Sequence, residues 1–285
     1  MVIGMKIRLK DIFEIVISLM TFLVFSGCQK VIKVDLNEAA PRIVIEGLVN
    51  DRRGPYTVTI SKSGSYFNQP VLQTVSGAQA IISDDSGTTD TLKEAAPGVY
   101  LTSSTRGIPG RTYTLKVISE DQEYDGSTTM FSHVSIDSLT LVKSQVQRID
   151  FGGNDQNKLH IEIHCFFRDP VEKNFYRLKV FKNDSTNTES YRLFDDQYTN
   201  GEETELRVAN ASAGDTFRIE LLSLDAKTYG YYRTLEDLIF TNPFFGSTPA
   251  NPNNNLSNGA LGYFGACAIS SKTIIITDSL IKSVK

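Results

Sequence analysis

Three side chains on one short stretch have the types and the spacing that could hold a metal ion. His160, Glu162 and His164 alternate with apolar residues, so on a β-strand all three would point to one face. Imidazole and carboxylate groups are ligands of zinc and related metals. The two histidines would lie about 13 Å apart along the strand, which is too far for both to reach one ion. A site would need two neighbouring members and a donor from another strand, and we favour a solvated sheet face instead.

Signatures of catalysis are scarce elsewhere in the sequence. It contains no Gly-x-Ser-x-Gly, no glycine-rich phosphate loop with its Lys and no His-Glu-x-x-His, the best-known motifs of nucleophilic, nucleotide-binding and zinc-protease sites. Gly259, Gly262 and Gly265 recur at intervals of three, but no β-α-β pattern surrounds them, so we interpret them as turn and close-packing glycines. The sequence therefore predicts no enzyme and no cofactor.

Aromatic and amide side chains gather late in the chain, where they could form a binding surface. Exposed aromatic rings beside amides can stack on a ligand or contact a partner protein. The alternative is that the rings fill a core, and we favour this for most of them because aromatic residues dominate small β cores. The sequence contains no Trp, which lowers the expectation of a sugar-stacking platform. The candidate members are Tyr231, Phe244, Phe245, Asn254, Tyr263 and Phe264.

The start of the chain has the parts of a secretion signal that ends in a lipid-modified cysteine. Basic residues precede an apolar run over residues 15–25, and Ser26 and Gly27 stand directly before Cys28. This junction resembles the bacterial lipoprotein signal, and the apolar run is too short to span a bilayer. An ordinary signal or an uncleaved anchor is the alternative. We predict a signal peptide over residues 1–27, lipid attachment at Cys28 and a tether over residues 28–41.

Two further thiols, Cys165 and Cys267, remain once Cys28 carries lipid. Both lie in strand-like runs, and export would take them to a compartment in which a disulfide persists. A bridge between them and two separate buried thiols are both consistent with the sequence, because spacing alone does not choose.

Residues 42–131 alternate as short β-strands bounded by Gly, Pro and Asp, with no helical pattern among them. The segment from Asp84 to Gly87 has the composition of a hairpin turn in which Gly87 takes a positive φ. We predict a two-sheet antiparallel sandwich that is immunoglobulin-like or transthyretin-like. Tyr113, Leu115 and Val117 would face its core.

Residues 132–285 predict a second antiparallel β domain that contains one helix. Asp225 can cap a helix over about residues 226–240, and Pro243 stops it. An Asn- and Pro-rich stretch over residues 247–258 predicts a long exposed loop. One face of the helix would carry Tyr229, Tyr232, Leu235 and Ile239.

The charge of the chain limits the classes of partner that we expect it to bind. The formal net charge is −4, and removal of residues 1–27 takes away three basic and two acidic residues, which leaves −5. No basic run occurs, so we expect no nucleic-acid partner and no electrostatic docking on anionic lipid. Attachment to a membrane is expected only through the lipid.

Several short motifs follow Cys28 in a fixed order. They are Val44-Ile45-Glu46-Gly47, Gly54-Pro55-Tyr56-Thr57-Val58, Val75-Ser76-Gly77-Ala78, Gly98-Val99-Tyr100, Gly110-Arg111-Thr112-Tyr113 and Asn258-Gly259-Ala260-Leu261-Gly262-Tyr263-Phe264-Gly265. Together with the lipid signal, this order resembles one family, the DUF4249 lipoproteins of Bacteroidota-type bacteria, a domain of unknown function. The resemblance implies anchoring in the outer membrane, often beside a TonB-dependent outer-membrane transporter, and no established reaction. Residues 29–32 lack the acidic side chains common in surface-exposed lipoproteins, so periplasmic and external orientation both stay open.

These observations favour a lipid-anchored, non-enzymatic envelope protein that binds a ligand or partner through its second domain, as an accessory of TonB-dependent uptake. A structural or adhesive cell-surface lipoprotein without a nutrient ligand is the alternative. A third hypothesis, a metal-dependent hydrolase, depends only on the strand that contains His160.

Overall fold

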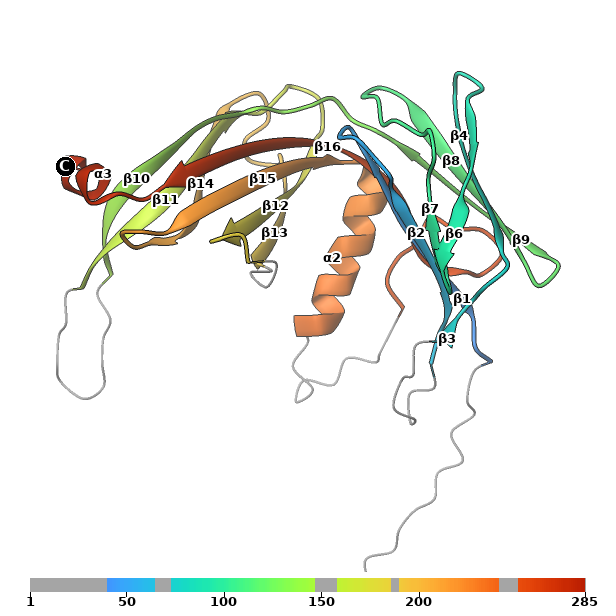
Figure 1. Cartoon of the computed structure of the whole chain (residues 1–285). Coiled ribbons are helices and arrows are strands. Elements are labelled where there is room, and N and C mark those ends of the chain that lie inside the picture. Colours follow the sequence, from blue (N-terminus) through green and yellow to red (C-terminus); the bar gives the residue numbers. More distant parts are fainter. Residues whose placement is uncertain (1–39, 65–72, 147–157, 186–189, 241–250, 285) are drawn as a thin grey trace, which may run out of the picture. The chain divides into compact units, whose positions relative to one another are not determined.

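The computed structural model describes residues 40–64, 73–146, 158–185, 190–240 and 251–284. Within these ranges the chain is mostly β, with three sheets and two helices (Figure 1). The mostly β, antiparallel fold class expected from the alternating strands is therefore confirmed. The predicted signal peptide, Cys28 and most of the tether lie outside the described residues.

The largest sheet contains nine strands and runs through both halves of the chain. Its order is β13-β12-β15-β16-β1-β2-β7-β6, and β3 pairs with β2 beside this path. Neighbours are antiparallel except β1 and β16, which run parallel. The strands are β1 (Ile43–Asn50), β2 (Thr57–Lys62), β3 (Gln73–Thr74), β6 (Lys93–Ala96), β7 (Val99–Leu101), β12 (Phe175–Lys182), β13 (Ser190–Asp195), β15 (Thr216–Leu224) and β16 (Leu261–Ile275).

A four-stranded sheet packs on the first part of the large sheet through a shared apolar core. Its order is β5-β4-β8-β9. The core contains Tyr113, Leu115 and Val117, as expected, together with residues of β1 and β2. Gly87 takes a φ of 87° in the turn between β4 and β5, which the turn composition predicted. The strands are β4 (Gln79–Asp84), β5 (Thr89–Thr91), β8 (Thr112–Ser119) and β9 (Gln122–Thr129).

A three-stranded sheet of order β10-β11-β14 shares a second apolar core with the other part of the large sheet. Phe167 and Tyr176, which come from β11 and β12, meet edge to face in this core with ring centroids 5.4 Å apart. Such aromatic pairs contribute beyond their buried area. The strands are β10 (Ile136–Val146), β11 (Lys158–Arg168) and β14 (Glu203–Ala211).

β16 joins the two regions that the sequence predicts as separate domains, residues 42–131 and residues 132–285. Its first part pairs with β1 in a parallel register from Val44 opposite Leu261 to Asn50 opposite Cys267. The rest of the strand, from Cys267 onward, pairs with β15. Phe264, Ala266 and Ala268 of β16 contribute to the first core, and Ile276 just beyond the strand contributes to the second. The first core and the large sheet therefore both contain residues from each side of the expected boundary, and residues 40–285 form one compact unit.

Helix α2 (Ala226–Phe240) lies against the face of the large sheet that is turned away from both cores (Figure 1). The sequence predicted both its extent and its cap: Asp225 Oδ1 accepts hydrogen bonds from the backbone N–H groups of Lys227 and Thr228 at 2.7 and 2.8 Å. Its predicted buried face is correct only in part, because Ile239 is 57% exposed. A short helix, α3 (Asp278–Ser283), follows β16. Within the described ranges, neither helix has the length and apolar character that a membrane span requires.

Candidate functional site

Three tyrosines pack together where α2 meets β16, and we call them the tyrosine cluster: Tyr231, Tyr232 and Tyr263. The rings of Tyr231 and Tyr263 stack with centroids 4.4 Å apart, and the hydroxyl groups of Tyr232 and Tyr263 lie 2.6 Å apart. The close approach of α2 to β16 depends on Gly265, because a Cβ at this position would lie 2.7 Å from Thr228 Oγ1. The close-packing role expected for this glycine is therefore confirmed.

Charged groups border the tyrosine cluster on two sides. The Tyr231 hydroxyl donates a hydrogen bond to Glu46 Oε1 at 3.2 Å. Burial raises the pKa of Tyr231, and the nearby Glu46 carboxylate raises it further, so the phenol remains a donor at neutral pH. The guanidinium of Arg177 lies over the ring of Tyr232, 4.2 Å from its centroid. Such a cation–π contact fixes the guanidinium against the helix.

The surface expected from the aromatic residues is only partly present. Tyr231 is 6% exposed and Phe264 is fully buried in the first core, so neither offers a ring to a ligand. The prediction was wrong for Phe264 because successive residues of a strand point to opposite faces, and Tyr263 takes the face of α2. Asn254 is exposed and donates a hydrogen bond to the carbonyl of Ala260 at 3.1 Å. Phe244 and Phe245 lie outside the described residues.

Residues 251–258 of the expected exposed loop are held against the first core. Asn255 Nδ2 donates to the carbonyls of Ser127 and Phe264, and its Oδ1 accepts from the Phe264 N–H at 3.0 Å. Leu256 is 9% exposed and forms a β-bridge with Gly126. The composition of this stretch gave no sign that one amide would bind two strands, so Asn255 was missed.

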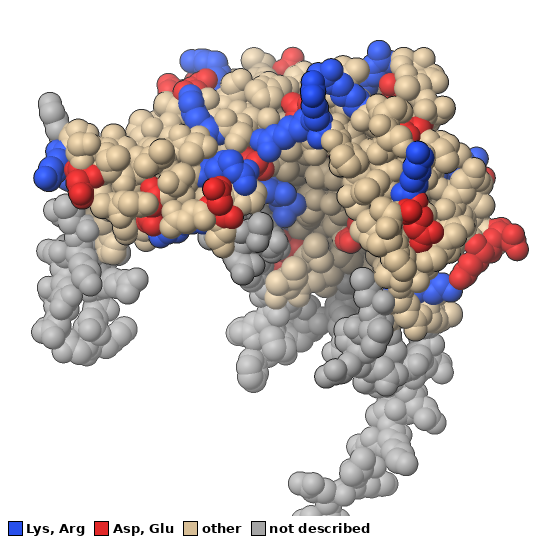
Figure 2. Space-filling view, in the orientation of Figure 1, with Lys and Arg blue, Asp and Glu red and all other residues tan. Residues whose placement is uncertain are grey.

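Basic side chains gather beside α2 on the same face of the large sheet, around one buried carboxylate. We call this set the basic strip, and Figure 2 shows Lys and Arg side chains in the region of β15 and β16, near a hollow of the surface. Glu220 of β15 stands opposite Lys179 of β12 in the antiparallel register. Glu220 also forms ion pairs with two arginines. The strip consists of Arg52, Arg177, Lys179, Arg218 and Glu220.

A pattern in the sequence indicates part of the basic strip, although it was not among the predictions above. In β12, Arg177 and Lys179 alternate with apolar residues, and Arg218 and Glu220 do the same in β15. The period places each pair on one face. It does not say that β12 and β15 are neighbours, nor that Arg52 reaches them from the chain after β1.

Two of the three candidate metal residues on β11, Glu162 and His164, take part in an ion-pair network. His164 Nδ1 lies 2.6 Å from Glu205 Oε1, and Glu162 forms an ion pair with Arg207 at 2.8 Å. Burial opposes ionisation of Glu162, but the hydrogen bonds from Arg207 and His164 outweigh it and lower the pKa of the carboxyl. In the described part of the chain, no group of three or more His, Cys, Asp or Glu side chains could hold a metal ion. The arrangement on β11 therefore gives no support to a hydrolase.

Cys165 and Cys267 are free thiols in two different apolar clusters. Of the two alternatives that the sequence left open, the structure contains separate buried thiols. Burial raises the pKa of each thiol to about 12. Because the thiolate is the reactive form, both are chemically protected in the native state.

We expect neither Cys165 nor Cys267 to react with the thiol reagent DTNB at pH 8 in native Cys28→Ala protein, and both to react after unfolding in guanidinium. A pKa near 12 leaves about one thiolate in 10,000 at that pH, before access is considered. Release of the coloured thiolate measures the number of reacting groups. A bridged pair would give none even after unfolding, and rapid reaction of the native protein would contradict the burial.

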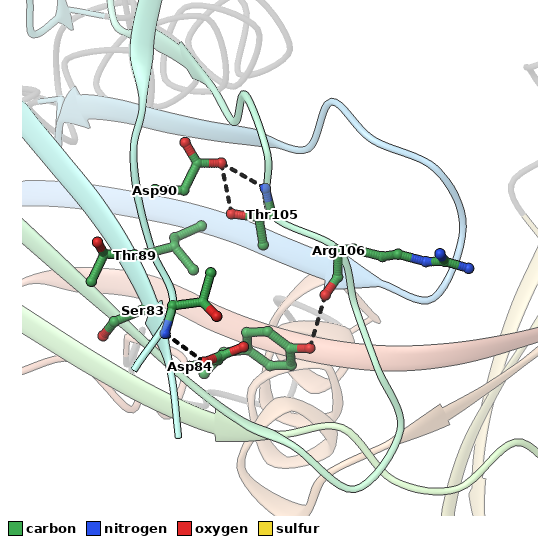
Figure 3. A pocket seen from close by; sticks show the side chains of 9 residues that line it. Ser83, Asp84, Thr89, Asp90, Thr105 and Arg106 are labelled. Atoms are coloured by element: carbon green, nitrogen blue, oxygen red, sulfur yellow. Dashed lines mark hydrogen bonds between the residues drawn. The ribbon is translucent and has the colours of Figure 1, made fainter. Parts of the chain in front are cut away.

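A small cavity near β4 and β5 is structural (Figure 3). Its volume is about 20 Å³, which is room for a single water molecule. Asp90 points toward Thr105 and accepts hydrogen bonds from the N–H groups of residues 103–105 and from Thr105 Oγ1. Burial works against ionisation, but these donors outweigh it and lower the pKa of Asp90. The carboxylate therefore holds a turn through its Oδ2 atom.

A larger pocket of about 260 Å³ lies beside the start of α2. Thr128, Phe131, Asp225 and Lys227 are among its lining residues. Its volume lies just below the range of typical small-molecule sites. Thr128 Oγ1 donates to Asp225, and Asp225 also caps α2, so the buried polar atoms of this pocket already serve the fold.

Comparison with known proteins identifies a family. The model of a family described as a domain of unknown function, DUF4249, matches residues 29–273. No curated protein matches the chain. The match covers most of the chain, including the tyrosine cluster and the basic strip.

Proposed function

The chain belongs to the DUF4249 family, and we propose that it is a lipid-anchored protein of the outer membrane that binds a ligand or partner protein without catalysis. One observation carries the anchoring: the family match begins at residue 29, directly after the Ser26-Gly27-Cys28 junction. The region shared by the family thus starts where a lipoprotein signal would leave its modified cysteine.

The proposed role is that of an accessory of TonB-dependent uptake. More than one acyl chain on Cys28 holds a protein stably on a membrane. Confinement to the plane of the membrane raises its effective concentration near a transporter in the same bilayer, so a weak contact suffices. The basic strip supports a binding role, because it places exposed arginine side chains on one face of the sheet.

The test is recovery of partners from native membranes. The lipidated protein is purified in mild detergent beside a Cys28→Ala form, and co-purifying proteins are identified by mass spectrometry. An outer-membrane transporter recovered only with the lipidated form is the expected result. Recovery of no partner by lipidated protein that fractionates with the outer membrane would favour a structural or adhesive role instead.

A further inference from the structure

Two carboxylates are buried at one end of the second core. Asp169 follows β11 and is 1% exposed, and Asp196 follows β13 and is 3% exposed. Phe167 and Phe194, which stand two residues before them, contact the ring of Tyr176 with centroids 5.4 and 5.1 Å away. The backbone pairing of both strands continues through the two acidic residues. Because residues two apart on a strand share a face, both carboxylates lie at the same end of this aromatic group.

In the described ranges, the hydrogen bonds to these carboxylates come from neutral groups. The Tyr176 hydroxyl and the Gly201 N–H donate to Asp169, and the Asn174 N–H donates to Asp196 Oδ2 at 2.7 Å. A carboxylate has about four lone-pair sites, so three donors leave most sites of the pair unused. Buried charges in proteins are usually paired or bound to a metal, and these two carboxylates have no cationic donor.

The two carboxylates act on each other and on the same phenol. Burial raises the pKa of Asp169, and the charge of Asp196 raises it further, against the opposing effect of the hydrogen bonds from Tyr176 and Gly201. Burial and then both carboxylates raise the pKa of the Tyr176 hydroxyl as well. Two negative charges therefore surround one point in the protein interior, and a divalent cation would balance both.

An unpaired hydroxyl group lies beside the two carboxylates. Thr204 of β14 is 4% exposed, and its Oγ1 has no hydrogen-bond partner among the described residues. It stands opposite Phe167 in the register of β11 and β14, so it shares the face of Asp169. The turn from β13 to β14 brings it close to Asp196 as well, since a side chain of β13 bonds to the backbone of β14. A buried hydroxyl without a partner is costly, and a bound ion is one way to satisfy it.

We propose that Asp169, Asp196 and Thr204 bind a calcium ion. Ca²⁺ takes about six to eight oxygen ligands, of which two carboxylates and one hydroxyl supply about five, and water or loop carbonyls supply the rest. Mg²⁺ fits less well, because it keeps several water molecules that a buried site has little room for. Only two of these ligands are acidic, so the site differs from the clusters of three or more that the described residues lack. The ion would join the loops after β11 and β13, which bear the exposed side chains of Val171 and Tyr198.

Terbium luminescence tests the site in the full lipidated protein in mild detergent, after treatment with EDTA and removal of the chelator. Tb³⁺ replaces Ca²⁺ at oxygen sites, and Tyr176 should sensitise its emission because the hydroxyl of this residue bonds to Asp169. We expect Ca²⁺ to displace Tb³⁺ and Mg²⁺ to be at least about tenfold less effective. Absence of emission on excitation of tyrosine would overturn the proposal, and so would equal competition by Mg²⁺.

Thermal unfolding gives a second readout. Ca²⁺ at about 100 times its Kd should raise the midpoint by about 5 to 10 °C relative to EDTA. In EDTA, Asp196→Asn should be at least as stable as the unchanged protein because one of two like charges is gone, whereas in Ca²⁺ it should be less stable. Thr204→Val should show the same reversal, because it removes both a ligand and an unpaired hydroxyl. A midpoint shift with Ca²⁺ that both variants retain in full would contradict the proposal.

The matched control is Asp90→Asn, which makes the same substitution at a buried carboxylate beside the first core. Asp90 accepts its hydrogen bonds within a turn, so Ca²⁺ should raise the midpoint of this variant as much as that of the unchanged protein. Loss of the Ca²⁺ response in Asp90→Asn but not in Asp196→Asn would place the ion elsewhere and overturn the assignment. Neither measurement depends on recovery of a partner, so its result is separate from that of the proposed function.

Discussion

Replacing Gly262 with Ala is expected to lower the free energy of unfolding by about 3 to 5 kcal/mol. Gly262 has a φ of 94°, a conformation that other residues rarely adopt. A Cβ at this position would lie 2.1 Å from the carbonyl oxygen of Ile45. The obstacle is backbone of the paired strand β1, so it cannot rotate away. The clash would therefore open the parallel pairing that joins the two halves of the chain.

Gly87→Ala is the matched control for Gly262→Ala. Gly87 has a similar φ of 87°, but a Cβ at this position would meet no atom within 4 Å beyond its chain neighbours. Gly87→Ala should lower the free energy of unfolding only by the backbone strain, about 1 to 2 kcal/mol. Denaturation in urea, followed by circular dichroism, measures both changes. Equal losses would show that the contact with Ile45 contributes nothing and that strain alone accounts for the effect.

The sequence predicted well those elements whose signals are local. Helix α2 was placed correctly because a capping Asp, a helical period and a following Pro agree over about twenty residues. Its interior Gly230 has open space around it, so no packing requirement explains the glycine. The strands were also found, since alternation with period two is a strong signal when one face is buried. The hairpin turn at Gly87 depends on chemistry within a few residues.

The features that were missed depend on which strands become neighbours. The parallel pairing of β1 with β16 joins residues that are far apart in the chain, such as Val44 and Leu261. The alternation of apolar residues within a strand does not indicate which other strand will pair with it. Phe264 was grouped with Tyr263 because they adjoin in sequence, yet the sheet places them on opposite faces. The basic strip combines three segments in the same way. Local patterns thus predicted which faces are polar, and the topology decided which polar groups meet.

Asp225→Ala is expected to lower the free energy of unfolding by about 3 kcal/mol and to loosen α2 from the sheet. The carboxylate caps two N–H groups of the helix, which contributes about 1 to 2 kcal/mol. It also accepts a hydrogen bond from Thr128 Oγ1, and a buried bond to a charged group contributes about 1.5 to 3 kcal/mol. Thr128 in turn accepts from the N–H of Ala266 in β16. One side chain therefore links the helix, β9 and β16.

The tyrosine cluster provides a specific readout for Asp225→Ala. Because the chain contains no Trp, its near-ultraviolet circular dichroism arises mainly from tyrosines. Tyr231 and Tyr232 belong to α2 and Tyr263 to β16, so movement of the helix should reduce that signal before global unfolding. Thr277→Ala removes the exposed cap of α3 and should cost about 1 kcal/mol or less, with the tyrosine signal unchanged. An unchanged signal in stable Asp225→Ala protein would mean that apolar packing alone holds α2, because the cap would then be dispensable for its position.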